Sequence, residues 1–315
     1  MIISNIIGCT GTVIFFLLVS VWVPLVGPLF SLLIQLPFLY YLSKSGSSLG
    51  WKTGLISLLI IGLIARLAGY PQLILFCIAL GVIGLIISEI FKREFTFGLT
   101  ILWGTVLVLF IGAVFLFFIG LSKGTNAVEL IVDYLQGNVN RSISLYEEMG
   151  LDQETTIQLR QFGTVLNSII ARIYPALLVI GAGVIIWINV VVSKPLFKLG
   201  RVKYPDLGRT DMWHAPEFMV WGVIAAGFSL FFPITGIKFI ALNTLIVLLV
   251  IYVFHGLSII MFFFNRHNIP LWARFGVYLL IMVQLIFLVF LVLAGLFDQW
   301  IDFRKIHKKG LEEIQ

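Results

Sequence analysis

The chain has 315 residues, of which 60% are hydrophobic and only 11% are charged, whereas about a quarter of the residues of a soluble domain carry charge. Apolar surface on this scale excludes a soluble globular protein, so we expect a polytopic membrane protein. The formal net charge of +6 does not predict nucleic-acid binding, because Lys and Arg lie between apolar runs and form no basic stripe with interleaved aromatic residues.

Apolar runs close to the roughly twenty residues that cross a bilayer predict an all-α transmembrane helix bundle of about nine spans. Strands are not expected, because the runs are too long and lack two-residue alternation. The first run has no basic region before it and is followed at once by further spans, which favours a retained helix. Eight spans stay possible if the first hairpin does not cross fully. The predicted spans are residues 5–23, 28–43, 51–67, 71–91, 96–121, 168–193, 216–235, 239–264 and 271–297.

A polar segment rich in acidic residues, 123–171, separates the fifth and sixth spans. Apolar residues recur in it at helical spacing on both sides of an expected interruption at Gly137-Asn138. Leu151-Asp152 resembles the start of a helix that runs on into the sixth span. We expect a pair of amphipathic helices that lies on the bilayer or over a cavity, either as a connector that shields helix ends or as a lid.

A short basic linker divides the predicted spans into two blocks. Residues 1–195 would form a six-helix block with the amphipathic insertion, 196–212 the linker, 213–303 a three-helix block and 304–315 a basic and polar tail. Loops on the N-terminal side carry slightly more Lys and Arg than the other side, which favours a cytoplasmic N-terminus.

Polar residues in the three-helix block are the first candidates for function, because such groups are expensive in lipid. Glu217 follows Pro216 at the predicted start of a span, where a carboxylate is stabilised by the helix N-terminus. The alternative is a buried carboxylate paired with His255 or Arg274. Trp213 and Trp221 are expected to be interfacial anchors on either side of it.

The remaining intramembrane groups allow structural and functional interpretations. We expect Asn243 to hydrogen-bond another helix, for about 1 kcal/mol. His255 would be a hydrogen-bonded packing residue, or else a proton relay or ligand contact. Asp298 would form an interfacial salt bridge, with Lys238 as one possible partner. The nine-span topology predicts that Asp298 lies at the opposite membrane face from Glu217, so that these carboxylates do not converge with His255 on one reaction centre.

The sequence contains no motif of a known catalytic site: no Gly-x-Ser-x-Gly, no His-Glu-x-x-His and no phosphate-binding loop. Cys9 and Cys77 lie in apolar runs and are expected in the core. The four histidines are too dispersed to predict a metal site. We therefore expect no enzyme, no catalytic residue, no metal and no cofactor, and any ATP-driven function would need separate ATPase subunits.

Three groups of residues resemble a known family. They are Trp213-x-x-Pro216-Glu217-x-x-x-Trp221, Asn243 with Tyr252-x-x-His255-Gly256, and Gly295-Leu296-Phe297-Asp298-x-x-x-Asp302-Phe303-Arg304. Together they resemble the YybS-like family of uncharacterised bacterial integral membrane proteins, which is grouped with the S components of energy-coupling-factor vitamin transporters. The resemblance covers nearly the whole chain and is most specific from Trp213 to Arg304. It implies an S-component-like fold for residues 1–195, in the bacterial inner (plasma) membrane.

The same resemblance implies where a ligand would bind. S components hold it at the extracytoplasmic side, in the loops after their first, third and fifth spans, which here are residues 24–27, 66–70 and 123–171. The implied ligand-binding residues are Arg66, Tyr70, Glu129 and Asp133. S components also dock through small residues of the first helix. The corresponding positions here are Ser4, Gly8 and Thr12, which depart from the family's alanine spacing.

The sequence thus favours a small-solute-binding or transport component without its own ATPase. Its expected partners are the lipid bilayer, other transporter subunits, an external ATPase and a small-molecule ligand, with no nucleic acid. The alternative is a non-transport assembly or regulatory protein that binds other membrane proteins through its C-terminal helices. The polar motif expected to matter there is Trp213, Pro216, Glu217, Trp221, Asn243, His255, Arg274 and Asp298.

Overall fold

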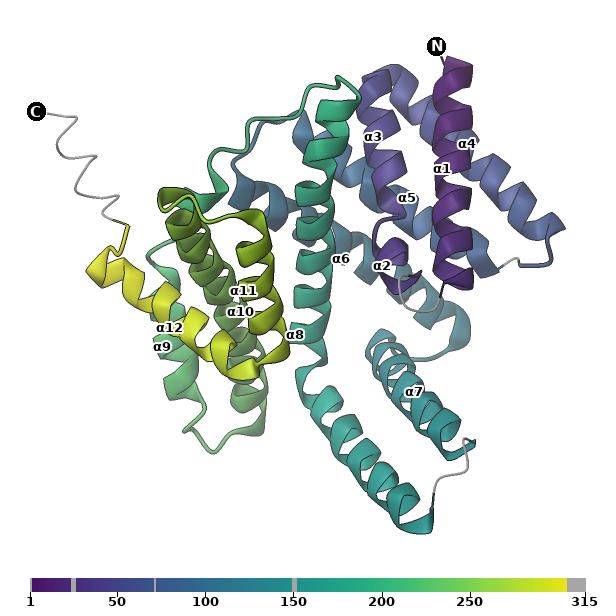
Figure 1. The fold of residues 1–315 in the computed structure, drawn as a ribbon. Helices are drawn as coiled ribbons and strands as arrows, with labels where there is room; N and C mark the ends of the chain where they lie inside the picture. Colours follow the sequence, from purple (N-terminus) through teal and green to yellow (C-terminus); the bar gives the residue numbers. More distant parts are fainter. Residues whose placement is uncertain (1, 24–26, 71, 149–151, 305–315) are drawn as a thin grey trace, which may run out of the picture. The chain divides into compact units, whose positions relative to one another are not determined.

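A computed structural model describes residues 2–23, 27–70, 72–148 and 152–304. Helix is the only regular secondary structure in these residues, which confirms the predicted all-helical membrane fold (Figure 1). The helices are α1 (Ile2–Trp22), α2 (Gly27–Leu32), α3 (Gln35–Ser45), α4 (Ser47–Leu67), α5 (Gln72–Phe91), α6 (Phe97–Lys123), α7 (Ala127–Glu148), α8 (Gln153–Leu199), the 3-10 turn η1 (Thr210–Met212), α9 (Met219–Ser229), α10 (Thr235–Arg266), α11 (Leu271–Val283) and α12 (Leu285–Ile301).

Six of the described helices are long and apolar enough to cross a membrane: α1, α4, α5, α6, α8 and α10. The count is seven if α11 and α12, which meet at an angle of 105°, form one broken span. Three of the nine predicted spans are therefore shorter or interrupted. They are residues 28–43, 216–235 and 271–297.

Proline accounts for two of these differences. The ring of a proline clashes with the carbonyl four residues earlier, so a helix tends to end there. Four residues before Pro37 is Leu33, where the helix breaks between α2 and α3. Four residues before Pro233 is Ser229, the last residue of α9, which is only 11 residues long. The third break lies at Gln284, which has extended dihedral angles and is neither proline nor glycine.

Packing divides the chain into two units, residues 1–112 with 181–208 and residues 113–180 with 209–315. This division differs from the predicted blocks 1–195 and 213–303, because α8 contributes residues to both units.

In the first unit, α1, α3, α4 and α5 pack against one another around two apolar clusters. Cys9 and Cys77 are fully buried free thiols in one of these clusters, as predicted. Gly8 makes room for the ring of Tyr41 on α3, because a Cβ there would collide with the Tyr41 hydroxyl. This small-residue position of α1 therefore packs against Tyr41 of α3, within the same unit.

In the second unit, α7 and the first part of α8 form the predicted pair of amphipathic helices (Figure 1). The expected interruption at Gly137-Asn138 is wrong, since α7 continues through it and the Asn138 side chain donates to the Tyr134 carbonyl oxygen at 2.9 Å. The second helix does run on: α8 is a single helix of 47 residues that begins directly after Asp152. Leu151 lies outside the described residues.

Candidate functional site

Helix α12 crosses α10 (Figure 1). The polar residues of the C-terminal helices gather at this crossing. Two glycines permit the close approach of these helices. A Cβ on Gly295 would lie 2.5 Å from the Tyr252 carbonyl oxygen, and one on Gly256 would collide with the Leu291 carbonyl oxygen. The 105° bend before α12 turns this helix across α10, so residues at its end come beside the second half of α10.

A buried charged cluster occupies this crossing. The Asp298 Oδ2 atom lies 2.8 Å from Arg304 Nη2 and 3.0 Å from His255 Nε2, and the two nitrogens are 3.0 Å apart. The side chains of His255 and Arg304 are each 1% exposed and that of Asp298 is 6% exposed. Asp298 Oδ1 accepts from the Phe303 N–H at 2.9 Å, which fixes the end of α12. We call His255, Asp298 and Arg304 the charged triad.

Arg304 also holds the segment that precedes α9. Its Nη1 atom lies 3.1 Å from the Asp211 carbonyl oxygen, 3.0 Å from the Trp213 carbonyl oxygen and 3.1 Å from Ser258 Oγ. Ser258 Oγ is itself within 2.9 Å of the Thr210 carbonyl oxygen and 2.7 Å of that of Trp213. One buried guanidinium therefore joins residues 210–213 to α10 and to the end of α12.

Asp211, at the edge of this arrangement, has its own set of donors. Arg209 donates to its two carboxylate oxygens from Nε at 3.2 Å and from Nη2 at 2.8 Å, and Asn265 Nδ2 donates at 3.1 Å. The hydrogen bonds from Arg209 hold the pKa of the Asp211 carboxyl below its ordinary value, with a smaller contribution from Asn265. The ionised carboxylate of Asp211 thus connects η1 to the end of α10 through its hydrogen bond with Asn265.

A small cavity opens beside the triad, with a volume of about 10 Å³. Glu217, His255 and Asp298 all line it, so the expectation that Glu217 and Asp298 lie at opposite faces is wrong. A straight ninth span would have carried Asp298 to the far end, whereas the bend before α12 returns it to His255. The complete lining is His214, Ala215, Glu217, His255, Asp298, Gln299, Asp302 and Arg304.

Other predicted pairings also differ. The partners of Asp298 are His255 and Arg304, not Lys238. Arg274 was a predicted partner of Glu217, but its hydrogen bonds go to the end of α10. It donates to Asn265 Oδ1 at 2.7 Å and to the carbonyl oxygens of Ile269 and Phe264 at 2.8 and 3.2 Å.

Glu217 is exposed and lies in the turn before α9, while the Pro216 carbonyl oxygen accepts from the Met219 N–H. The side chain of Trp221 is 70% exposed, in keeping with a membrane-facing anchor. Trp213 instead packs edge-on to His255, with ring centroids 6.2 Å apart.

Asn243 forms the predicted interhelical hydrogen bond, with α8. Its Oδ1 accepts from the Ala176 N–H at 2.9 Å, and its Nδ2 donates to the Arg172 carbonyl oxygen at 2.8 Å. The Ala176 N–H and the Arg172 carbonyl belong to the same helical turn of α8. This turn contains Pro175, which has no N–H to donate. The carboxamide therefore satisfies α8 backbone where proline weakens the helical ladder.

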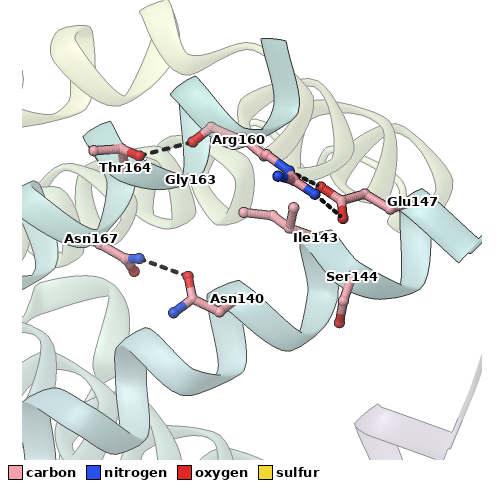
Figure 2. Close-up of a pocket in the computed structure, with 8 residues that line it drawn as sticks. All are labelled: Asn140, Ile143, Ser144, Glu147, Arg160, Gly163, Thr164 and Asn167. Atoms are coloured by element: carbon pink, nitrogen blue, oxygen red, sulfur yellow. Dashed lines mark hydrogen bonds and ion pairs between the residues drawn. The ribbon is translucent and has the colours of Figure 1, made fainter. Parts of the chain in front are cut away.

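A larger pocket of about 350 Å³ lies between α7 and α8 (Figure 2). Arg160 donates to Glu147 from Nε at 2.8 Å and from Nη2 at 3.2 Å, and this hydrogen bonding lowers the pKa of the Glu147 carboxyl. Asn167 Nδ2 donates to Asn140 Oδ1 at 2.8 Å. The complete lining is Asn140, Ile143, Ser144, Glu147, Arg160, Gly163, Thr164 and Asn167.

Within the described part of the chain, no group of three or more His, Cys, Asp or Glu side chains is arranged to hold a metal ion. The side chains that line the two cavities offer hydrogen bonding, ion pairing and proton exchange.

The family described as "Predicted membrane protein (DUF2232)" matches residues 12–299. The chain belongs to this family. No curated protein and no solved structure matches it. Membership agrees with the apolar helices in identifying a membrane protein, and the family description assigns no activity.

The residues predicted to bind a ligand in this family member do not meet at either cavity. Glu129 and Asp133 are exposed on α7, and Arg66 and Tyr70 are exposed at the end of α4, in the other unit. None of the four lines the two cavities described above. The α7–α8 pocket was missed because its polar residues recur at ordinary helical spacing, which any solvated helix face also shows.

Proposed function

We propose that the chain is a membrane component that binds a small polar solute between α7 and α8. It would act in solute binding or transport without an ATPase of its own. The observation that carries the proposal is the α7–α8 pocket, whose volume of about 350 Å³ lies in the range of small-molecule sites.

The lining of this pocket suits a ligand with hydrogen-bond donors. Asn167 Oδ1 is buried and has no hydrogen-bond partner among the described residues, although its Nδ2 is used by Asn140. A buried acceptor without a donor is costly, so a bound molecule or water is expected to supply one. The Glu147–Arg160 pair adds one charge of each sign at the rim.

The position of the pocket agrees with the resemblance to S components. Those proteins take their ligand partly in the segment between the fifth and sixth spans, and the pocket lies wholly within residues 123–171 of that segment. We therefore propose an S-component-like role for this chain, as a YybS-like protein in the bacterial inner membrane. An external ATPase pair and a coupling subunit would drive it, because the sequence has no phosphate-binding loop.

A thermal-shift screen tests the binding step. The purified protein in detergent is scanned with free amino acids, polyols and water-soluble vitamins. A binding solute at a hundred times its Kd stabilises the folded state by about 2.7 kcal/mol. We expect at least one solute to raise Tm in the wild type and in Asn138→Ala, and not in Asn140→Ala.

Asn138 is the matched control, because it is an exposed asparagine on α7 two residues from Asn140 and does not line the pocket. The proposal is contradicted if no solute in the panel stabilises the protein, or if Asn140→Ala keeps the full shift. Isolation from native membranes with other membrane proteins but without an ATPase pair would favour the assembly or regulatory alternative over transport.

A further inference from the structure

Two buried nitrogens of the charged triad have no hydrogen-bond partner among the residues that the structure describes. His255 Nδ1 and Arg304 Nε form no hydrogen bond with any described residue, although both side chains are only 1% exposed. Buried polar groups are nearly always hydrogen-bonded, to protein or to ordered water. Both residues line the small cavity beside the triad. Its volume of about 10 Å³ is enough for a single water molecule.

The contacts of the other ring nitrogen limit what can bind at Nδ1. Arginine can only donate hydrogen bonds. If Arg304 Nη2 donates to His255 Nε2, the neutral ring carries its proton on Nδ1, and Nδ1 needs an acceptor. If Nε2 carries the proton and donates to Asp298, Nδ1 of the neutral ring needs a donor. Nε2 lies at the same 3.0 Å distance from both partners, so the geometry supports either arrangement.

A water molecule both donates and accepts, and therefore serves Nδ1 in both arrangements. We propose that His255 is a proton-binding site that exchanges a proton with solvent at Nδ1 through one water in this cavity. In the uptake step an O–H bond of the protonated water breaks, an N–H bond forms at Nδ1, and Nε2–H donates to Asp298. The carboxylate is then shared by the imidazolium and the guanidinium, and the charged triad carries a net charge of +1.

The cavity connects the imidazole with ionisable groups nearer the surface. His214 and Glu217 are exposed and Asp302 is half-buried, so solvent protons can reach the cavity along this lining. The titratable or charged groups around His255 are Tyr252 from α10, Asp298, Asp302 and Arg304 from α12 and the turn after it, and His214 and Glu217 from the segment before α9.

Proton uptake has a structural consequence. Uptake at Nδ1 proceeds from the arrangement with a proton on Nε2, and in that arrangement Nε2 cannot accept from Arg304 Nη2. Proton uptake therefore selects the arrangement in which the guanidinium is held by Asp298 and not by the imidazole. The same guanidinium holds the carbonyl oxygens of Asp211 and Trp213. The charge of His255 is therefore coupled to the attachment of residues 210–213. This site shares no lining residue with the α7–α8 pocket, and the two proposals stand or fall separately.

Trp213 is a built-in reporter, because its ring lies edge-on to His255 at 6.2 Å and an imidazolium quenches indole fluorescence more strongly than a neutral imidazole. The fluorescence intensity of Trp213 is obtained by subtracting the emission of the Trp213→Phe variant from that of the wild type. We expect this difference to fall by at least a third between pH 8 and pH 5, the interval in which histidine ordinarily changes charge.

The change should disappear in His255→Gln and persist in His267→Gln, which removes another histidine at the end of the same helix. A pH-independent Trp213 signal in folded wild-type protein overturns the proposal, as does a change that survives His255→Gln.

A second measurement does not depend on the His255 variant folding. In a chain with His214, His267 and His307 replaced by Gln, the only imidazole is that of His255. The two 15N chemical shifts of this imidazole should converge between pH 8 and pH 5, because both nitrogens of an imidazolium carry a proton. Resonances that stay fixed over this interval contradict the proposal.

Discussion

At the scale of single residues, the Asp298–Arg304 ion pair is buried with only 6% and 1% of the two side chains exposed. Removing one partner of such a pair leaves a buried charge uncompensated, which costs about 3–5 kcal/mol. We expect Asp298→Leu and Arg304→Met each to lose about this much stability in detergent, measured by thermal or denaturant unfolding. The double variant should lose less than the sum of the two single losses, because it leaves neither charge alone.

The exposed pair Glu94–Lys203, with side chains 59% and 83% exposed, is the control. Such surface pairs contribute at most about 1 kcal/mol, so Lys203→Met should change stability little. Equal losses in Lys203→Met and Arg304→Met would contradict the buried role of the triad.

From the lowered pKa of the Asp211 carboxyl we expect the free energy of unfolding to depend on pH. Because its folded-state pKa lies below the ordinary value of about 4, ionised Asp211 stabilises the folded state above that value. The contribution is lost as the pH falls through the folded-state pKa. We expect Asp211→Asn to cost about 1–2 kcal/mol at pH 6 and progressively less below about pH 4. A Tm difference between the two proteins that is the same at pH 6 and pH 3 would be inconsistent with this.

At the scale of elements, the crossing of α10 and α12 depends on glycine at Gly256 and Gly295, where an added Cβ meets backbone. Backbone cannot move aside as a flexible side chain can, so we expect Gly256→Ala and Gly295→Ala to destabilise by about 1–3 kcal/mol. At Gly276 on α11, no atom of the described residues lies within 4 Å of the place that a Cβ would take. Gly276→Ala should therefore be neutral or stabilising by up to about 1 kcal/mol. If all three variants unfold at the wild-type temperature, the described crossing is wrong.

The contact of α8 with α10 depends on Asn243. Asn243→Leu leaves the Ala176 N–H and the Arg172 carbonyl without the carboxamide, so we expect a loss of about 1 kcal/mol and faster amide exchange at Ala176. Thr244→Leu changes the neighbouring exposed residue of α10 and should leave the exchange of Ala176 unchanged. Slow exchange at Ala176 in Asn243→Leu would exclude this role.

The sequence predicted the long helices well, since six uninterrupted apolar runs appear as α1, α4, α5, α6, α8 and α10. The prediction of spans from hydropathy was wrong where a local feature interrupts the helix. Pro37 and Pro233 shorten two runs whose mean composition is that of a span. The bend at Gln284 has no signal of that kind. Because the partners of Asp298 depend on this bend, His255 and Arg304 could not be assigned to it from the sequence.

At the scale of the whole molecule, composition predicted the membrane class and the family match agrees with it. The division into two units could not be predicted from composition, because α8 is continuous and belongs to both. The α7–α8 pocket depends on the register between two amphipathic helices, which hydrophobic periodicity does not specify. The proposed solute site therefore stands on contacts such as Asn140–Asn167 and not on a motif.

Binding of a small polar solute between α7 and α8 can be observed by native mass spectrometry of the protein purified from its own membranes. We expect a fraction of the wild-type and Asn138→Ala protein to carry one small-molecule adduct, which should be absent from Asn140→Ala. Bare protein in all three samples, or an adduct that Asn140→Ala retains in full, would contradict it.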